Sequence, residues 1–247
     1  MTLFLTSHCG GYFRKGEQRL PAELNHTNGF LDELKKRWVN GSRLLLMAAS
    51  ETDFKTNDSI LRVFSQAFPM SGLSVSSASV CDGRNPELVR SLGDYDVIIL
   101  SGGHVPTQNL FFRSIDLRRY IRDFRGIVIG ISAGTMNCAD TVYAHPELDG
   151  EAVDPNYSRY LQGLGLTEYM ILPHYQKIKN DILDGLRVFE DIAYPDSLGK
   201  SFYALCDGSY ILQEGDHTQL RGEAFKIADG ILRQISSHND IVDLKNE

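Results

Sequence analysis

The sequence predicts an α/β fold, a three-layer α/β/α sandwich with a mostly parallel sheet and a C-terminal antiparallel hairpin region. Three observations favour this class. Nearly continuous aliphatic runs occur at residues 44–49, 97–100 and 127–131, which is typical of strands that are covered on both faces. Helix-length amphipathic segments separate these runs, as in βαβ units. After residue 200 the runs become short and closely spaced, which indicates antiparallel strands.

The expected helices alternate with these strands. The first covers residues 30–38, with apolar side chains recurring on one stripe. The second follows the capping residues Asn57, Asp58 and Ser59 and extends to Phe68. Further helices are expected near residues 86–92, 110–124 and 177–192, and directly after Ser132. Together these crossovers should wrap both faces of one sheet.

The C-terminal part is expected to extend the same domain. Its short apolar runs are residues 202–206, 210–213, 224–227 and 231–235. Asp229-Gly230 between the last two runs is a hairpin signal. Because the chain has no Gly/Ser-rich or Pro-rich linker and no repeat, residues 1–247 are predicted to form one domain.

Composition excludes several classes of protein. Hydrophobic residues make up 42% and charged residues 23%, which excludes disordered, collagenous and coiled-coil chains. A formal net charge of -7 argues against nucleic-acid binding, which needs a clustered basic surface. No apolar run is long enough for a membrane helix, and the N-terminal run 2–7 is too short for a signal segment and lacks a basic leader, so a cytoplasmic protein is expected. The four cysteines form no CxxC pair, and the chain has no HExxH, GxGxxG or GxxxxGK motif, so neither a metal nor a nucleotide cofactor is expected. The oligomeric state stays open.

A nucleophile candidate lies in Gly130-Ile131-Ser132-Ala133-Gly134, which matches GxSxG. The match follows an aliphatic strand and precedes a helix-compatible stretch, which is the context of a nucleophile elbow. Glycines two places on either side of the serine avoid collisions with neighbouring backbone in such a turn. We therefore predict that Ser132 projects from the sheet edge and that the Ala133 amide is available to a developing oxyanion. The alternative is a strand that ends at glycine and is followed by a serine cap.

A second glycine turn, Ser101-Gly102-Gly103-His104, follows strand 97–100 and should lie at the same carboxyl edge of the sheet. Gly103 is the second expected oxyanion donor, because a residue without a side chain lets its amide approach a carbonyl oxygen closely. His104 either lines the pocket or caps the next helix. The alternative is that the two glycines form only a turn.

His174 is the expected general base among seven histidines. A serine hydroxyl needs a base within hydrogen-bond reach, and the base needs an orienting group. His174 follows the apolar run 170–172 and precedes a polar stretch, which places it at a strand end. The rival base is His145, which has Glu147 two residues later. It lies only 13 residues after Ser132, a gap that the helix leaving the elbow should fill.

Asp207 is the expected orienting acid. It ends the apolar run 202–206 and is followed by Gly208, a strand-end position like that of the expected base. Glu147, Asp140 and Asp149 remain open as alternatives.

Four sequence blocks resemble the dipeptidase E and cyanophycinase group of serine peptidases, whose fold is similar to the class I glutamine amidotransferase α/β sandwich. The blocks are residues 98–104, 126–134, 172–175 and 204–208, in the family's order over most of the chain. The resemblance implies that Ser132 is the nucleophile and His174 the base. It also implies that the amides of Gly103 and Ala133 form the oxyanion hole. The order Ser, His, acid differs from the order Ser, acid, His of α/β-hydrolases.

Three features depart from the family's pattern. Asp207 stands where dipeptidase E has a glutamate, which shortens the side chain by one methylene. His104 stands where the family's aspartyl dipeptidases have asparagine, and the loop before Gln108 is longer; both residues are expected to contact the substrate. The family's arginine for the substrate aspartate has no clear counterpart in residues 176–179. A lysine there supplies charge but no bidentate fork.

These inferences predict a serine peptidase that cleaves small peptides, with dipeptides that begin with aspartate among the candidate substrates. Ser132 would attack the scissile carbonyl, His174 would transfer the proton and Asp207 would fix the imidazole tautomer. A serine esterase and a catalytically silent binding domain on the same fold are the alternative functions.

Overall fold

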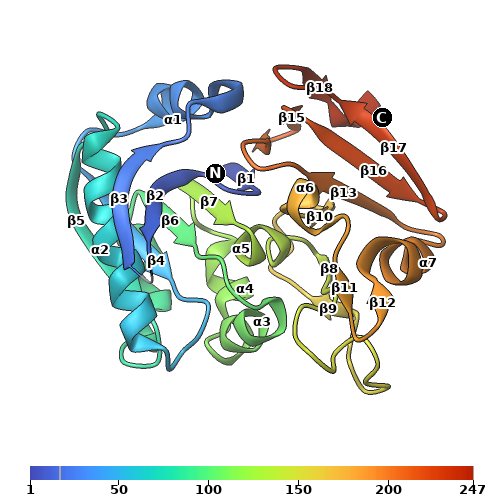
Figure 1. Ribbon diagram of the computed structural model, residues 1–247. Helices are drawn as coiled ribbons and strands as arrows, with labels where there is room; N and C mark the ends of the chain where they lie inside the picture. Colours follow the sequence, from blue (N-terminus) through green and yellow to red (C-terminus); the bar gives the residue numbers. More distant parts are fainter. Residues whose placement is uncertain (17, 247) are drawn as a thin grey trace.

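An eight-stranded mixed sheet forms the centre of the computed structural model, which describes residues 1–16 and 18–246 (Figure 1). The strand order is β18-β15-β14-β1-β7-β6-β4-β5. The five strands from β1 to β5 in this order pair in parallel, whereas β14, β15 and β18 are each joined by antiparallel pairing. In chain order the strands are β1 (Thr2–Thr6), β4 (Ser42–Met47), β5 (Val75–Cys81), β6 (Val97–Leu100), β7 (Ile127–Ile131), β14 (Tyr210–Glu214), β15 (His217–Arg221) and β18 (Ile241–Asp243). The predicted α/β sandwich with a mostly parallel sheet is confirmed.

A second sheet of four strands lies beside the first (Figure 1). Its order is β10 (Met170–Leu172), β13 (Ser201–Leu205), β16 (Ala224–Ala228) and β17 (Ile231–Ser236). The predicted hairpin at Asp229-Gly230 joins β16 to β17, and both turn residues have positive φ. The four C-terminal runs divide between the two sheets, because β14 joins the first sheet whereas β13, β16 and β17 belong to the second.

Three two-stranded ribbons complete the strands. They are β2 (Gly10–Lys15) with β3 (Gln18–Leu24), β8 (Thr141–Tyr143) with β9 (Tyr160–Gln162), and β11 (Ile182–Leu183) with β12 (Leu186–Arg187). The helices are α1 (Phe30–Arg37), α2 (Phe54–Met70), α3 (Val105–Ser114), α4 (Leu117–Ile121), α5 (Ala133–Met136), α6 (Tyr175–Ile178) and α7 (Tyr194–Asp196). Short 3-10 segments cover Thr27–Gly29, Pro86–Asp94 and Leu244–Asn246, and a π-helical turn covers Val188–Ala193.

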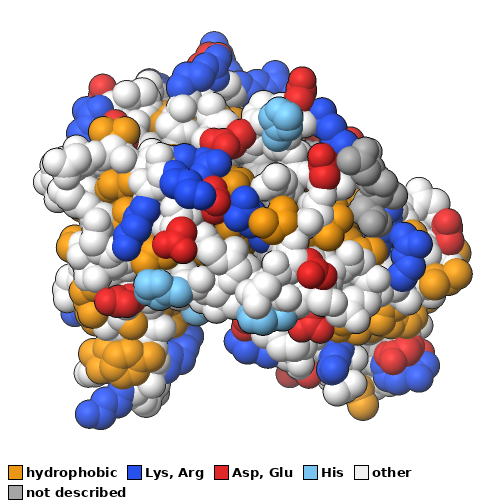
Figure 2. All heavy atoms as spheres, turned by 90° about the horizontal axis from the view of Figure 1, so that it is seen from above, with side chains coloured by type: hydrophobic (Ala, Val, Ile, Leu, Met, Phe, Trp, Pro, Cys, Tyr) orange, Lys and Arg blue, Asp and Glu red, His pale blue; other side chains and the backbone are white. Residues whose placement is uncertain are grey.

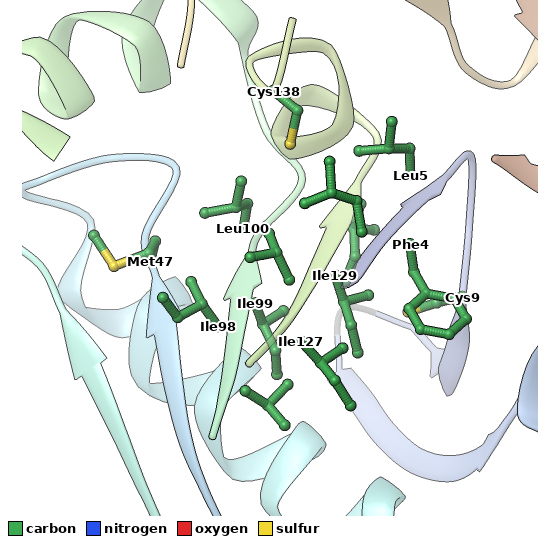
Figure 3. Close-up of a cluster of buried hydrophobic side chains, with 14 of the residues drawn as sticks. Phe4, Leu5, Cys9, Met47, Ile98, Ile99, Leu100, Ile127, Ile129 and Cys138 are labelled. Carbon is green, nitrogen blue, oxygen red and sulfur yellow. The ribbon is translucent and has the colours of Figure 1, made fainter. Parts of the chain in front are cut away.

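The aliphatic runs form strands because they are buried on both faces. Every residue of β6 and β7 is buried, and side chains from β1, β4, β6 and β7 meet in one cluster (Figure 3). A second cluster of buried side chains lies around α5, β10 and β13. Ile131, directly before Ser132, belongs to the first cluster, and Ala133, directly after it, belongs to the second. The turn at Ser132 is therefore held by buried side chains on both sides.

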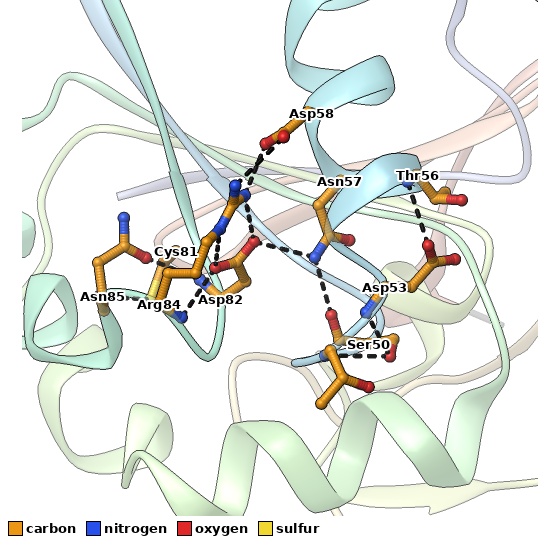
Figure 4. A network of polar contacts seen from close by, with 10 residues as sticks. Ser50, Asp53, Thr56, Asn57, Asp58, Cys81, Asp82, Arg84 and Asn85 are labelled. Carbon is orange, nitrogen blue, oxygen red and sulfur yellow. Dashed lines mark hydrogen bonds and ion pairs between the residues drawn. The ribbon is translucent and has the colours of Figure 1, made fainter.

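Helix α2 begins earlier than the sequence predicted. Asp53 is its N-cap and accepts a hydrogen bond from the Thr56 amide at 3.2 Å. Asn57, an expected cap, instead lies buried inside the helix and donates to Asp82 at 3.0 Å (Figure 4). The correct capping signal was the Asp three residues before Thr56.

Two other expected helices were wrong in extent. The segment 110–124 is divided between α3 and α4, because Asp116 has a φ of 54° and interrupts the helical backbone. The segment 177–192 is helical only at its ends, and β11 and β12 form a hairpin between them. Asp184-Gly185 makes that turn with positive φ at both residues, the Asp-Gly pattern that favours a tight hairpin.

Candidate functional site

Ser132 occupies a sharp turn between β7 and α5. Its φ of 51° and ψ of −115° are rare for a residue with a side chain and are typical of strained functional positions. A Cβ on Gly130 would lie 2.8 Å from Thr135 Cα, and a Cβ on Gly134 would overlap the carbonyl oxygen of Leu100. The predicted steric reason for both glycines is therefore confirmed.

The glycine turn after β6 and the first residue of α5 lie beside this serine. Ala133 is the first residue of α5, so its amide has no acceptor within the helix. Gly102 packs against Ser132, because a Cβ on Gly102 would lie 3.3 Å from the serine Cβ. At Gly103 a Cβ would overlap that of Ala49, so this turn accepts no side chain. The turn after β6 and the elbow after β7 are thus adjacent at the carboxyl edge of the sheet.

Gln108 supports this turn from inside the protein. It is buried, and its Nε2 donates to the Ser101 carbonyl at 2.7 Å while its Oε1 accepts from Asn137 at 3.1 Å. The expectation that Gln108 contacts substrate was wrong, because the side chain is enclosed and its amide is already bonded on both sides.

His174, at the end of a strand of the second sheet, lies beside Ser132. It follows β10 with a left-handed φ of 62°, and its Nε2 lies 3.0 Å from Ser132 Oγ. Its Nδ1 lies 2.6 Å from Asp207 Oδ1. Both β10 and β13 end at this point, since they pair in parallel. The structure thus brings Ser132, His174 and Asp207 together.

Asp207 has bonding partners in addition to the His174 imidazole. Lys177 Nζ lies 2.6 Å from its Oδ2, Ser7 Oγ donates to its Oδ1 at 2.7 Å, and its own amide donates to Gln176 Oε1 at 2.9 Å. Burial opposes ionisation of Asp207. Hydrogen bonds from His174, Lys177 and Ser7 outweigh burial and hold the pKa of Asp207 well below its usual range. The carboxylate is therefore ionised at neutral pH.

Ser7 was missed by the sequence analysis. It is fully buried, follows β1, and accepts a hydrogen bond from the His174 amide at 2.8 Å. Its hydroxyl therefore joins the acid to the backbone of the histidine. The available signal was a polar residue directly after the apolar run that forms β1, at the same carboxyl edge as Ser132.

His104 contacts a loop rather than the serine. Its Nε2 lies 2.8 Å from Glu151 Oε1, and its Nδ1 lies 2.8 Å from Thr107 Oγ1. It occupies the N-cap position of α3, but its side chain makes no capping hydrogen bond there. Glu151 also accepts hydrogen bonds from the amides of Glu147 and Leu148, so it joins the glycine turn to the loop after β8.

The rival pair His145 and Glu147 lies in that loop. The His145 ring is buried, and its Nδ1 is 3.8 Å from Glu147 Oε1. Burial, with a smaller contribution from Arg159, lowers the pKa of His145 to about 4. Burial and the charge of Glu151 raise the pKa of Glu147 to about 7. The base and acid that contact Ser132 and each other are instead His174 and Asp207.

A cleft of about 260 Å³ opens in front of Ser132. Its floor includes the glycine turn, Ser132 and His174. One wall comes from α2 through Ile60, Val63 and Phe64, and the other comes from His8 and the β2–β3 hairpin. Burial lowers the pKa of His8, against the charge of Asp207, so this second imidazole beside the cleft favours its neutral form.

In residues 1–16 and 18–246, no three His, Cys, Asp or Glu side chains are grouped so that they could hold a metal ion. No helix there has the length and apolar character to cross a membrane.

A protein-family model matches most of this chain and shows the family to which it belongs. The model of peptidase family S51 matches residues 16–221. The chain belongs to peptidase family S51. This match spans the serine, the histidine and the aspartate, and it confirms the resemblance to the dipeptidase E family. No curated sequence is significantly similar to the chain.

Two solved structures have a fold similar to that of this chain. A peptidase from an acI-B1 Actinobacterium has a TM-score of 0.67 and 17% identity, with 98% of this chain and 96% of that chain covered. A peptidase E candidate from Listeria monocytogenes EGD-e has a TM-score of 0.58 and 16% identity, with 95% and 98% covered. At these identities the likeness concerns the fold, and it extends over nearly the whole of each chain.

Proposed function

We propose that this S51 family member is a serine peptidase that hydrolyses short peptides through an acyl-enzyme on Ser132. The observation that carries the proposal is the continuous hydrogen-bonded line from Ser132 Oγ to His174 Nε2, at 3.0 Å, and from His174 Nδ1 to Asp207, at 2.6 Å. A base within this distance removes the hydroxyl proton as the serine attacks a carbonyl.

Each residue has one task in the proposed mechanism. Asp207, ionised, fixes the His174 tautomer with Nδ1 protonated, so that Nε2 is free to accept the serine proton. The amides of Gly103 and Ala133 donate to the oxyanion of the tetrahedral intermediate. His174 then protonates the leaving amine, and a water molecule activated by the same imidazole releases the acyl group.

The proposed substrates are short peptides, including dipeptides that begin with aspartate. Lys177 and Gln176, which stand near the position of the family's substrate-binding arginine, are bonded to Asp207. A group that recognises a substrate carboxylate therefore has to come from another part of the cleft.

A panel of dipeptides tests the proposal, with Ser132→Ala as the blank. Removing the nucleophile of such a unit costs about 10⁶ in kcat in a well-studied serine protease, so turnover should become undetectable. Labelling by a fluorophosphonate should also disappear. An unchanged hydrolysis rate in Ser132→Ala would rule out the mechanism. Nitrophenyl esters that turn over far faster than every dipeptide would make the protein an esterase, and failure of wild-type Ser132 to react would make it a silent binding domain.

A further inference from the structure

The β2–β3 hairpin turns one face toward the cleft. In its antiparallel register Tyr12 lies opposite Pro21 and Arg14 lies directly opposite Arg19. Since side chains alternate between faces along a strand, Tyr12, Arg14 and Arg19 share one face. The same three residues line the cleft that contains Ser132. The two arginines are therefore presented to the space in front of the nucleophile.

Two guanidinium groups opposite each other are unfavourable by themselves, because like charges directly across a strand pair repel. Within residues 1–16 and 18–246 neither group forms an ion pair with a carboxylate. The pKa of Asp53 is lowered mainly by its bond to Thr56 and only in smaller part by the charge of Arg19. Arg14 is exposed and Arg19 is partly buried. Both remain accessible to an anion that enters the cleft.

Ring contacts connect His8, which lines the same cleft as His174, to Arg19. His8 is close enough to His174 and Asp207 for their charges to act on it. The rings of His8 and Tyr12 are 5.5 Å apart, and the Arg19 guanidinium lies over the Tyr12 ring at 5.9 Å. The surface therefore continues from His174 outward along the hairpin. In the view from above, Lys/Arg and His side chains border a hollow at the lower edge of the molecule (Figure 2).

The direction of this surface determines which half of a peptide it meets. The imidazole of a serine peptidase protonates the leaving amine, so the leaving half of the substrate lies on the His174 side. That half ends in the peptide's C-terminal carboxylate. A guanidinium binds a carboxylate through two parallel hydrogen bonds, which a lysine cannot provide.

We propose that Arg14 and Arg19 form a subsite for the C-terminal carboxylate of the leaving half of a short peptide. This inference rests on the proposed peptidase function. It explains why two like charges are kept opposite each other at the cleft, since a bound carboxylate offsets their repulsion. It also limits substrate length, because each added residue moves the carboxylate by about 3.3–3.6 Å. The subsite does not involve the side chain of the substrate's first residue.

Peptides in matched forms test this subsite. The series is Asp-Ala, Asp-Ala-Ala and Asp-Ala-Ala-Ala, each as the free acid and as the C-terminal amide, with a parallel series that begins with Asn. Binding is measured by calorimetry to Ser132→Ala, with and without Arg14→Gln and Arg19→Gln. The kcat/KM is measured in the active protein with the same arginine changes. Lys15→Gln, on the opposite face of the hairpin, is the matched charge control.

Amidation is expected to weaken binding of the best-fitting length by about 10- to 100-fold in Ser132→Ala, the range for a charge-assisted hydrogen bond. With both arginines replaced by Gln the penalty should fall below about threefold, while the Asp/Asn preference stays the same. Lys15→Gln should keep the full penalty. Unchanged fluorophosphonate labelling of the arginine variants in the active protein shows that they are folded.

Three outcomes would overturn the subsite: a penalty that survives in the double arginine variant, no penalty at any length, or loss of only the Asp/Asn preference in that variant. Failure of every peptide to bind Ser132→Ala would also overturn it. If the peptides bind with the expected penalty and the active protein hydrolyses none of them, the proposed peptidase function fails, and Arg14 and Arg19 remain a site for the C-terminal carboxylate of a bound peptide.

Discussion

Replacing Ser7 by alanine tests whether the site depends on a residue other than Ser132, His174 and Asp207. The Ser7 hydroxyl is buried, donates to Asp207 at 2.7 Å and accepts from the His174 amide at 2.8 Å. Alanine removes a hydrogen bond to a charged group, worth about 1.5–3 kcal/mol, and leaves a buried amide unsatisfied, which costs about 1–3 kcal/mol. Because the two losses share one hydroxyl and are not additive, we expect the free energy of unfolding to fall by about 2–4 kcal/mol.

The same change should slow the reaction of Ser132. Without the hydroxyl, the carboxylate and the backbone of the histidine lose their common anchor, and a misplacement of 1 Å can cost about 10²-fold in rate. We expect acylation by a nitrophenyl ester, measured in single turnover, to slow by about 10- to 100-fold. Urea denaturation of the same sample gives the stability.

Ser65→Ala is the matched control. Ser65 lies on α2 and makes one hydrogen bond, to the Leu61 carbonyl at 2.7 Å, so its loss should change stability by less than about 1 kcal/mol and leave acylation unchanged. The reasoning is refuted if Ser7→Ala unfolds within about 0.5 kcal/mol of the wild type and acylates at the wild-type rate.

Three further changes address charge and packing. Lys177→Met removes a cation that bonds the Asp207 carboxylate and helps to hold the pKa of Asp207 low. The free energy of unfolding should therefore fall at neutral pH by less than about 1 kcal/mol, and the difference from the wild type should shrink as the pH falls and Asp207 becomes protonated, whereas Lys179→Met should show neither effect. A difference that does not depend on pH contradicts this. Burial raises the pKa of Glu147 from 4.5 to about 7, so the folded state loses stability as pH rises through this window; Glu147→Gln should gain stability relative to the wild type between pH 5 and 8 in urea titrations, and a constant difference would count against it. Gly134→Ala places a Cβ on a backbone carbonyl oxygen and should destabilise by at least about 1–3 kcal/mol. Gly93→Ala enters open space and should stay within about 0.5 kcal/mol; equal thermal midpoints for the two variants would exclude the steric account.

The sequence predicted the parts of the fold that depend on local pattern. The strands at 97–100 and 127–131 were identified because a strand buried on both faces has to be apolar at every position. The hairpin at Asp229-Gly230 was identified because its turn needs two residues that accept positive φ. The same signal at Asp184-Gly185 was overlooked, and the helix expected there was wrong. In that segment the preference of Asp-Gly for a tight turn outweighed the helix-like spacing of the apolar residues.

The sequence predicted only some of the residues that form the site. Ser132 has a local signature, because two glycines and a strained turn lie within five residues. Ser7 and Gln108 have none: one joins the acid to the histidine backbone, and the other is enclosed beneath the glycine turn. Whether a polar side chain faces a cleft or the interior depends on elements that are distant in sequence.

By itself the sequence determined which segments are strands, where the backbone turns sharply, and that the chain carries the blocks of a serine peptidase family. These properties follow from side-chain size, polarity and backbone freedom over a few neighbouring residues. Only the tertiary structure decided that the histidine and the acid come from a second sheet and that Ser7 and Lys177 bond the acid. It also decided that Arg14 and Arg19, opposite each other on one hairpin, line the cleft. Each of these depends on contacts between distant segments, whose geometry is set by how the two sheets and the hairpin pack.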